Sequence, residues 1–271
     1  MFFKRMPHVT TLSDYNSDNI RAFLYEGRIK YKWKTVTFKS YFGALRGFAS
    51  WCVKRKLLPE NPLLDIERPK MEKTIPKSLK KDQAEALLDH VFHKKTIYRF
   101  ERYRNRALFG LMIFAGLRVA EVLALKIHDV DFQENSIFVR LGKGLKDRTV
   151  PLLSRLKVYL HEYMKERERI QRTTPFFITS VNGDRPFTAN GVKKVVEWLR
   201  HKSKIYFTCH GLRHTFATQM LRGGCNIYAL SKFLGHSDIR TTTIYLSASA
   251  DYLQKEIVKH PMNFNGTHVY S

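Results

Sequence analysis

The chain has 271 residues, of which 44% are hydrophobic, and it carries 48 Lys and Arg against 24 Asp and Glu. This composition excludes intrinsic disorder as the default, and the net charge of +24 exceeds what solubility requires. A polyanionic partner explains the charge best; we expect DNA or RNA, with a membrane surface or a ribosome as the alternatives.

Two segments before residue 59 have helical periodicity. Residues 17–27 form the first predicted helix, with Ser17 as its N-cap. Residues 35–56 form the second, and their apolar stripe consists of Phe38, Phe42, Leu45, Ala49 and Cys52. Cations flank these helices: Lys30, Lys32, Lys34, Lys54, Arg55 and Lys56. We expect a short helical, DNA-contacting domain over residues 1–70.

Four prolines interrupt both periodicities within residues 59–78. We therefore place a linker at residues 71–78 and a second domain at residues 79–271. Apolar residues recur at helical spacing in seven segments of this domain: about 80–92, 102–125, 153–170, 189–202, 210–222, 226–234 and 248–258.

The second domain also has extended segments. Residues 135–153 have the pattern of a β-hairpin around a Gly-Lys-Gly tip, and residues 175–187 that of a shorter extended piece with an Asn182-Gly183 turn. The predicted fold class is therefore mainly α with a small β-hairpin or sheet (α+β).

The cysteines and the apolar runs bear on the compartment. Cys52, Cys209 and Cys225 form no C-x-x-C pair and cannot all pair with one another, which favours a reducing interior and argues against a cysteine metal site. The most apolar run, residues 107–117, is well short of the roughly 20 residues that span a bilayer. We expect a cytoplasmic, nucleoid-associated protein with no membrane partner.

His210 and His214 have the i, i+4 spacing of a helical zinc site. That site needs a Glu after the first His, but Gly211 occupies this position, and Arg213 would place a fixed cation beside the metal. Residues 142–148 likewise lack the P-loop pattern for binding a nucleotide. We expect neither a metal nor a cofactor.

A phosphate site fits these residues better. A helix places His210, Arg213 and His214 on one face. Two guanidiniums with histidines can clamp the non-bridging oxygens of a phosphodiester and its pentavalent transition state. Arg118, near the start of a new helix, is the candidate for the second guanidinium, and a surface ion pair with Glu121 is the alternative explanation.

Tyr245 lies nine residues after His236 and follows three threonines. A tyrosine in such a place usually packs in a core. Its hydroxyl can nevertheless attack phosphorus if cations polarise the phosphate and a base, such as His210 or a water molecule, accepts the proton.

Together these segments resemble the tyrosine recombinase, or phage integrase, family, especially its Xer-like branch. The resemblance covers about residues 78–258. It rests on five motifs in order: A-G-L-R-x-x-E at 115–121, G-K-G-x-K-x-R at 142–148, H-x-L-R-H-T-F-A-T at 210–218, L-G-H-S at 234–237, and Tyr245.

The resemblance implies a role for each phosphate-binding residue. Arg118 and Arg213 would hold the scissile phosphate, and His236 would donate a hydrogen bond to it. His210 would assist proton transfer near the nucleophile, whereas His214 would be a supporting residue. We expect Arg213→Ala to abolish strand cleavage and to leave the fold nearly intact.

The resemblance also implies the covalent chemistry. Tyr245 would attack to give a 3′-phosphotyrosine and a free 5′ hydroxyl, and the strands would be exchanged through a Holliday junction without metal or ATP. Lys143, between the two glycines, would protonate the departing 5′ oxygen, with Lys146 as the competing candidate.

The partners implied are double-stranded DNA with a specific recombination site and further copies of the chain. The helix at 248–258 would pass to a neighbouring protomer in a tetramer on two DNA sites; a helix folded back on its own domain is the alternative. Members of the family usually have about four helices in the N-terminal domain, whereas only two are predicted here.

Three functions stay open at this point. A site-specific recombinase is expected, either for integration and excision of a mobile element, which the short N-terminal domain and high charge favour, or for chromosome dimer resolution. A type IB topoisomerase uses similar residues. A DNA-binding regulator without catalysis is the third, although it would have no need for Lys143 and Tyr245 together.

Overall fold

The computed structural model describes residues 1–67, 78–93, 98–140, 147–236 and 238–246. The chain divides into two compact units, Met1–Thr74 and Ile75–Ser271, called here the N-terminal and C-terminal units. The predicted linker at 71–78 lies outside the described residues except for Ser78.

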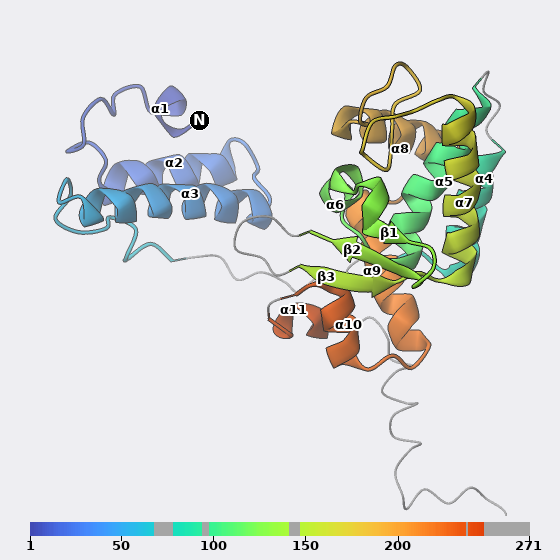
Figure 1. The fold of residues 1–271 in the computed structure, drawn as a ribbon. Coiled ribbons are helices and arrows are strands. Elements are labelled where there is room, and N and C mark those ends of the chain that lie inside the picture. Colours follow the sequence, from blue (N-terminus) through green and yellow to red (C-terminus); the bar gives the residue numbers. More distant parts are fainter. Residues whose placement is uncertain (68–77, 94–97, 141–146, 237, 247–271) are drawn as a thin grey trace, which may run out of the picture. The chain divides into compact units, whose positions relative to one another are not determined.

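Two helices that pack side by side, α2 (Ser17–Ile29) and α3 (Thr35–Lys54), form the body of the N-terminal unit, and the single turn α1 (Phe2–Arg5) precedes them (Figure 1). Asn16 caps α2, because its side chain accepts a hydrogen bond from the Asn19 amide at 3.0 Å. The prediction of Ser17 as the N-cap is therefore wrong by one residue.

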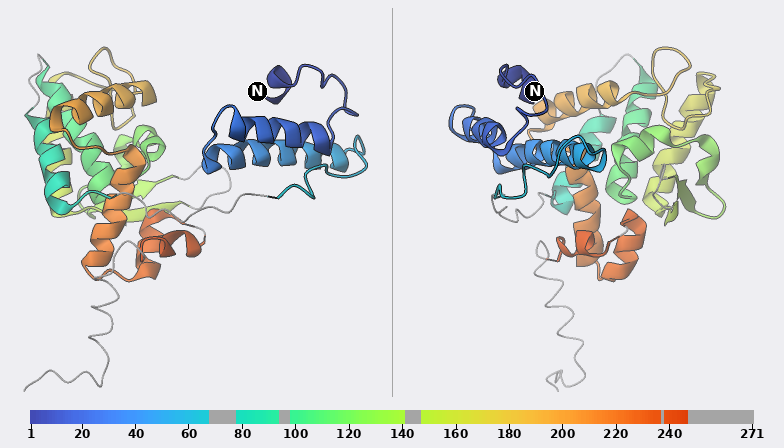
Figure 2. Two further views of the ribbon diagram at one scale, coloured as in Figure 1. Left: turned by 180° about the vertical axis from the view of Figure 1, so that it is seen from behind. Right: turned by 90° about the vertical axis from the view of Figure 1, so that its left-hand side faces the viewer.

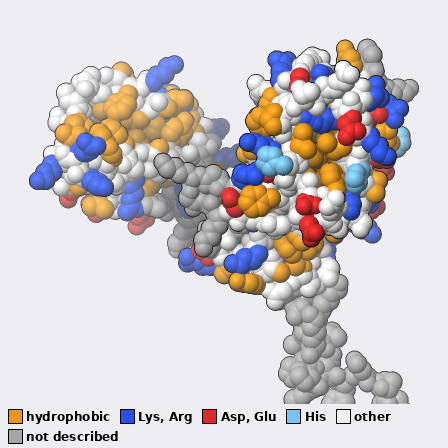
Figure 3. Space-filling view, viewed as in Figure 1, with side chains coloured by type: hydrophobic (Ala, Val, Ile, Leu, Met, Phe, Trp, Pro, Cys, Tyr) orange, Lys and Arg blue, Asp and Glu red, His pale blue; other side chains and the backbone are white. Residues whose placement is uncertain are grey.

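The predicted apolar stripe of α3 is confirmed: its buried residues are Phe38, Phe42, Leu45, Ala49 and Cys52. The first four of these pack with side chains of α1 and α2 in one core, where the Tyr15 hydroxyl donates a hydrogen bond to the Leu45 carbonyl at 2.8 Å. Hydrophobic side chains also lie on the visible surface of this unit (Figure 3), and Phe3, Tyr25, Phe48 and Trp51 are exposed.

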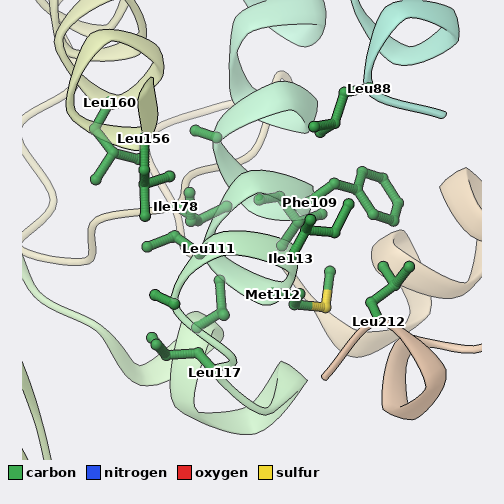
Figure 4. Close-up of a cluster of buried hydrophobic side chains, with 14 of the residues drawn as sticks. Leu88, Phe109, Leu111, Met112, Ile113, Leu117, Leu156, Leu160, Ile178 and Leu212 are labelled. Carbon is green, nitrogen blue, oxygen red and sulfur yellow. The ribbon is translucent and has the colours of Figure 1, made fainter. Parts of the chain in front are cut away.

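The C-terminal unit is organised around α5 (Arg99–Phe114), which contacts α4 (Lys81–Phe92), α7 (Ser154–Arg169) and α9 (Cys209–Arg222) (Figures 1 and 2). Every residue of α5 from Ala107 to Ile113 is buried. Figure 4 shows side chains of α5 between Leu156 and Leu160 on one side and Leu212 on the other. This C-terminal half of α5 is apolar on all sides and is therefore fixed by the helices around it.

A small antiparallel sheet lies beside these helices. Its strands, β1 (Val130–Asp131), β2 (Ser136–Val139) and β3 (Arg148–Pro151), are adjacent in chain order, and Ile137 pairs with Val150. The predicted hairpin strands are confirmed, and β1 is too short for the sequence pattern to predict. The segment 175–187 was predicted as extended, but it forms only the isolated bridges Thr179–Pro186 and Lys126–Phe176.

A turn splits the predicted helical segment 102–125. Gly116 has φ +64°, in the left-handed region, and a Cβ on it would lie 2.4 Å from Cδ1 of Phe216. The chain then enters α6 (Val119–Ala124), with Arg118 at the N-cap. The turn therefore sets the position of Arg118.

The remaining elements are η1 (Ile127–Asp129), α8 (Ala189–Ser203), α10 (Ile227–Leu234) and α11 (Arg240–Thr243). A separate apolar cluster joins α9, α10 and the residues after α11: Phe216, Ala217, Leu221, Leu230, Leu234 and Tyr245. Within the described part of the chain, no helix has both the length and the apolar character to cross a membrane.

Candidate active site

Glu121 is the centre of a buried ionic cluster. Its carboxylate accepts hydrogen bonds from the amide and Nη1 of Arg118, both at 2.8 Å, which closes the N-terminus of α6. Arg148 of β3 binds the same carboxylate through Nη1 at 3.0 Å and Nη2 at 2.8 Å. Nη1 of Arg213 lies 3.7 Å from it. Three guanidiniums therefore surround one carboxylate.

The ionisation of Glu121 follows from these contacts. Burial opposes its charge, but the hydrogen bonds from Arg148 and Arg118 outweigh burial and lower the pKa of Glu121 to about 2. The carboxylate is thus ionised at neutral pH. Positive charge still exceeds negative charge in the cluster. An anion such as a phosphate would therefore balance the excess charge.

Arg213 is more buried than the sequence indicates, with 1% of its surface exposed. Its Nη1 donates to the Gly116 carbonyl at 2.8 Å, and its Nη2 donates to the Leu234 carbonyl. Burial, followed by repulsion from Arg118, lowers the pKa of Arg213 to about 10, so the group stays charged at neutral pH. These bonds join α9 to the Gly116 turn and to α10, so Arg213 contacts backbone as well as the ionic cluster. The effect of Arg213→Ala on cleavage and on the fold stays a prediction.

His236 follows α10 and faces Arg213, whose Nη2 lies 3.3 Å from its Nε2. A guanidinium can only donate, so Nε2 accepts here, and Nδ1 carries the proton that it donates to Thr242 Oγ1 at 2.8 Å. Burial, followed by Arg213 and Arg118, lowers the pKa of His236 to about 4, which leaves the ring neutral at neutral pH.

Tyr245 packs in the apolar cluster of α9 and α10 with 2% of its surface exposed. Its hydroxyl lies 2.7 Å from Nδ1 of His214. Burial raises the pKa of Tyr245, and the charges of Arg213 and Arg118 oppose that rise. The two guanidiniums therefore favour the ionised form of Tyr245. A tyrosine that attacks a bound phosphate requires such an effect.

His210 lies beside this pair on the exposed side of α9, and its ring is edge-on to that of His214 with centroids 4.2 Å apart. Burial of part of the ring, followed by Arg213 and Arg118, lowers the pKa of His210. The sequence reasoning gave the proton-transfer role to His210 and a supporting role to His214. In the structure, His214 makes the direct contact with Tyr245.

Five of the six residues singled out from the sequence thus belong to one ionic and hydrogen-bonded neighbourhood: Arg118, His210, Arg213, His236 and Tyr245. The sixth, Lys143, lies outside the described residues, as does its competitor Lys146. Arg148 was missed, although it is the last residue of the G-K-G-x-K-x-R motif. Among the described residues, no group of three His, Cys, Asp or Glu side chains could hold a metal ion.

Comparison with known proteins shows the family of the chain. The model of the phage integrase family matches residues 77–251. The chain belongs to this family. Among phage integrase relatives, the tyrosine recombinase XerC of Bacillus licheniformis is 32% identical over 268 residues, which cover 95% of this chain and 86% of that protein. XerC of Chlamydia caviae is 30% identical over 238 residues, covering 87% and 74%.

Solved structures of phage integrase relatives have the same fold. The XerA recombinase is 26% identical with a TM-score of 0.60, and the match covers 97% of this chain and 88% of that one. The XerH site-specific recombinase, in a post-cleavage complex with difH substrate, gives a TM-score of 0.75 at 22% identity, covering 95% and 76%. The predictions of a mainly helical fold with a small sheet and of an Xer-like tyrosine site-specific recombinase are confirmed.

Proposed function

We propose that this recombinase cuts and rejoins DNA at a specific site through a 3′-phosphotyrosine on Tyr245. The observation that carries the proposal is the burial of the Tyr245 hydroxyl against His214 beside a cluster in which arginines outnumber carboxylates. An incoming phosphodiester would balance the excess positive charge of that cluster.

The phosphate would be held by Arg118 and Arg213. Arg118 is the accessible member, since 40% of its side chain is exposed, whereas Arg213 approaches from the buried side. When the phosphate takes the donor of Arg213, Nε2 of His236 is free to carry a proton and donate it. The hydroxyl of Thr242 can accept from or donate to Nδ1, so it serves both forms of the His236 ring.

The covalent step would join Oη of Tyr245 to phosphorus and break the bond from phosphorus to the 5′ oxygen. His210 would assist proton transfer near the tyrosine, and Lys143 would protonate the leaving 5′ oxygen. The phosphotyrosine ester keeps the energy of the broken bond, so a 5′ hydroxyl of another strand can reverse the step without ATP.

Residues 1–70, which fall within the N-terminal unit, would form a DNA-contacting domain joined by a linker at 71–78 to the catalytic domain at 79–271. Its exposed cations support this: Lys30, Lys32, Lys34, Lys54, Arg55 and Lys56. Cations of this kind bind the phosphate backbone without reading sequence. Double-stranded DNA is accordingly the proposed partner.

We also propose a tetramer on two DNA sites, with the predicted helix at 248–258 passed between protomers. Truncation after residue 250 should leave DNA binding intact and impair assembly of the two sites, measured by mobility shift of the paired complex. Unchanged tetramer formation by the truncated chain would contradict the proposal.

The function is tested by mixing the protein with sheared host DNA, denaturing in detergent, and sequencing the DNA ends that stay attached. We expect adducts at one recurring site with the wild type and none with Tyr245→Phe. Scattered adducts would contradict site specificity, and adducts with Tyr245→Phe would contradict the nucleophile. The recovered site also decides between mobile-element integration and chromosome dimer resolution.

A further inference from the structure

The contact between His214 and Tyr245 is more specific than a supporting role requires. Nδ1 of His214 lies 2.7 Å from the tyrosine hydroxyl, and the two rings come from segments 31 residues apart. Within the described part of the chain, His214 is the hydrogen-bond partner of this buried hydroxyl. A buried O–H needs an acceptor, and Nδ1 can accept this hydrogen bond when the ring proton of His214 is on Nε2.

The state of the His214 ring fits that direction. Burial, followed by repulsion from His210 and Arg213, lowers the pKa of His214 to about 4, so the ring is neutral at neutral pH. A neutral imidazole has one nitrogen with a free lone pair. If the proton is on Nε2, the lone pair of Nδ1 faces the tyrosine proton.

We propose that His214 is a further catalytic residue, the group that takes the proton of Tyr245 during cleavage and returns it during rejoining. As Oη bonds to phosphorus, its proton moves to Nδ1 and the bond from phosphorus to the 5′ oxygen breaks, with the 5′ oxygen protonated by Lys143. In rejoining, the 5′ hydroxyl returns its proton to Lys143 as its oxygen bonds to phosphorus, the bond from phosphorus to Oη breaks, and His214 gives its proton back to Oη. This assignment rests on the proposed function.

The incoming phosphate makes His214 a better base. The cations that disfavour a proton on His214 include Arg213, which the phosphate would contact. A phosphate charge next to that guanidinium weakens its repulsion and raises the proton affinity of the imidazole. The base would thus be weak without substrate and stronger once the scissile phosphate is bound.

Two substitutions separate proton transfer from orientation. His214→Ala removes the contact, whereas His214→Asn keeps an oxygen near the position of Nδ1 that accepts a hydrogen bond but no proton. With a nicked duplex carrying the captured site, we expect both variants to form the covalent adduct at least about a hundredfold more slowly than the wild type. The control is His161→Ala, an exposed histidine that stacks on Phe132, and it should cleave at the wild-type rate.

A wild-type rate for His214→Ala or for His214→Asn would overturn the assignment. Thermal melting of each variant checks that the chain is folded. If His214→Ala does not fold, the rate of His214→Asn provides the test. Wild-type protein that forms no adduct would overturn the proposed function and, with it, this assignment.

A second substrate distinguishes the role proposed for His214 from that of the acid that protonates the leaving group. If sulfur replaces the bridging 5′ oxygen, the leaving thiolate needs no proton. We expect this DNA to restore cleavage by Lys143→Ala and to leave His214→Ala slow. Recovery of His214→Ala would show that His214 acts on the leaving group and would contradict the inference.

Discussion

Arg148 binds Glu121 through both terminal nitrogens of its guanidinium, and its Nε donates to the Phe233 carbonyl at 2.7 Å. Arg213 makes the equivalent bond to the next carbonyl, that of Leu234. Two arginines therefore hold consecutive carbonyls at the end of α10, and only Gly235 separates the second of them from His236. The strand β3, the helix α6 and the histidine are fixed together through one carboxylate.

Loss of Glu121 should cost more stability than loss of Arg148. Glu121→Gln leaves three buried or half-buried guanidiniums without a counter-charge, whereas Arg148→Gln leaves the carboxylate with Arg118 and Arg213. Removing one partner of a buried ion pair costs about 3–5 kcal/mol. Urea unfolding at neutral pH measures the free energy of unfolding of both variants. A larger loss of that free energy for Arg148→Gln than for Glu121→Gln would contradict this ranking.

The contribution of Glu121 should also disappear in acid. Its folded pKa, about 2, lies below the ordinary value of 4.5, so its stabilisation is present above pH 4.5 and is lost as the pH falls toward 2. The difference in unfolding free energy between wild type and Glu121→Gln should shrink over that range. A difference that stays constant from pH 5 to pH 2.5 would contradict the ionic role.

Two histidines should destabilise the protein at milder acidity. His214 and His236 have folded pKa values of about 4 against an ordinary value of 6.5, so the unfolded chain binds protons that the folded chain refuses. Stability should fall as the pH drops from 6.5 to 4. The urea concentration at the midpoint of unfolding should change less across this pH range for His236→Gln than for the wild type. An identical change with pH in the two proteins would contradict the lowered pKa of His236.

Gly116→Ala should be more harmful than its conformation alone explains. A Cβ at Gly116 meets Phe216 at 2.4 Å, whereas Gly183 has a similar positive φ, +78°, with nothing within 4 Å. We expect Gly116→Ala to lose about 2–4 kcal/mol and Gly183→Ala about 1 kcal/mol. Thermal or urea unfolding of the two variants compares them, and equal losses would exclude the Phe216 contact as a cause.

Lysines of the N-terminal unit should contribute to the salt dependence of DNA binding. Lys32→Gln and Lys34→Gln should each lower the slope of log affinity against log salt by about 0.9 if the lysine contacts a phosphate. Lys165→Gln, an exposed lysine on α7, is the charge-matched control. Titrations at several salt concentrations give the slopes, and equal effects of all three variants would argue against a specific DNA-contacting role.

The sequence predicts the α3 stripe, the hairpin strands and most helices because each depends on local periodicity. It also singles out Arg118, Arg213, His236 and Tyr245 as candidates, since each stands in a recognisable motif, and the structure brings these side chains together. The burial of Arg213 was not predictable, because its acceptors are the carbonyls of Gly116 and Leu234, 97 and 21 residues away. No local pattern encodes such contacts.

The contact of His214 with Tyr245 has the same origin. Both side chains are visible in the sequence, but their 2.7 Å contact depends on how α10 and α11 fold back on α9. Arg148 is hard to recognise for a related reason: in the sequence, an arginine after a stretch that contains Lys143 and Lys146 resembles a solvent-exposed cation. Only the packing of β3 against α10 shows that it is buried.

Locating the covalent bond between protein and DNA tests the role of Tyr245 as the nucleophile. The protein is trapped on a nicked duplex carrying its captured site, digested with protease and nuclease, and analysed by mass spectrometry. We expect a nucleotide attached through its 3′ phosphate to the hydroxyl of Tyr245. Attachment to another residue, or through a 5′ phosphate, would contradict it.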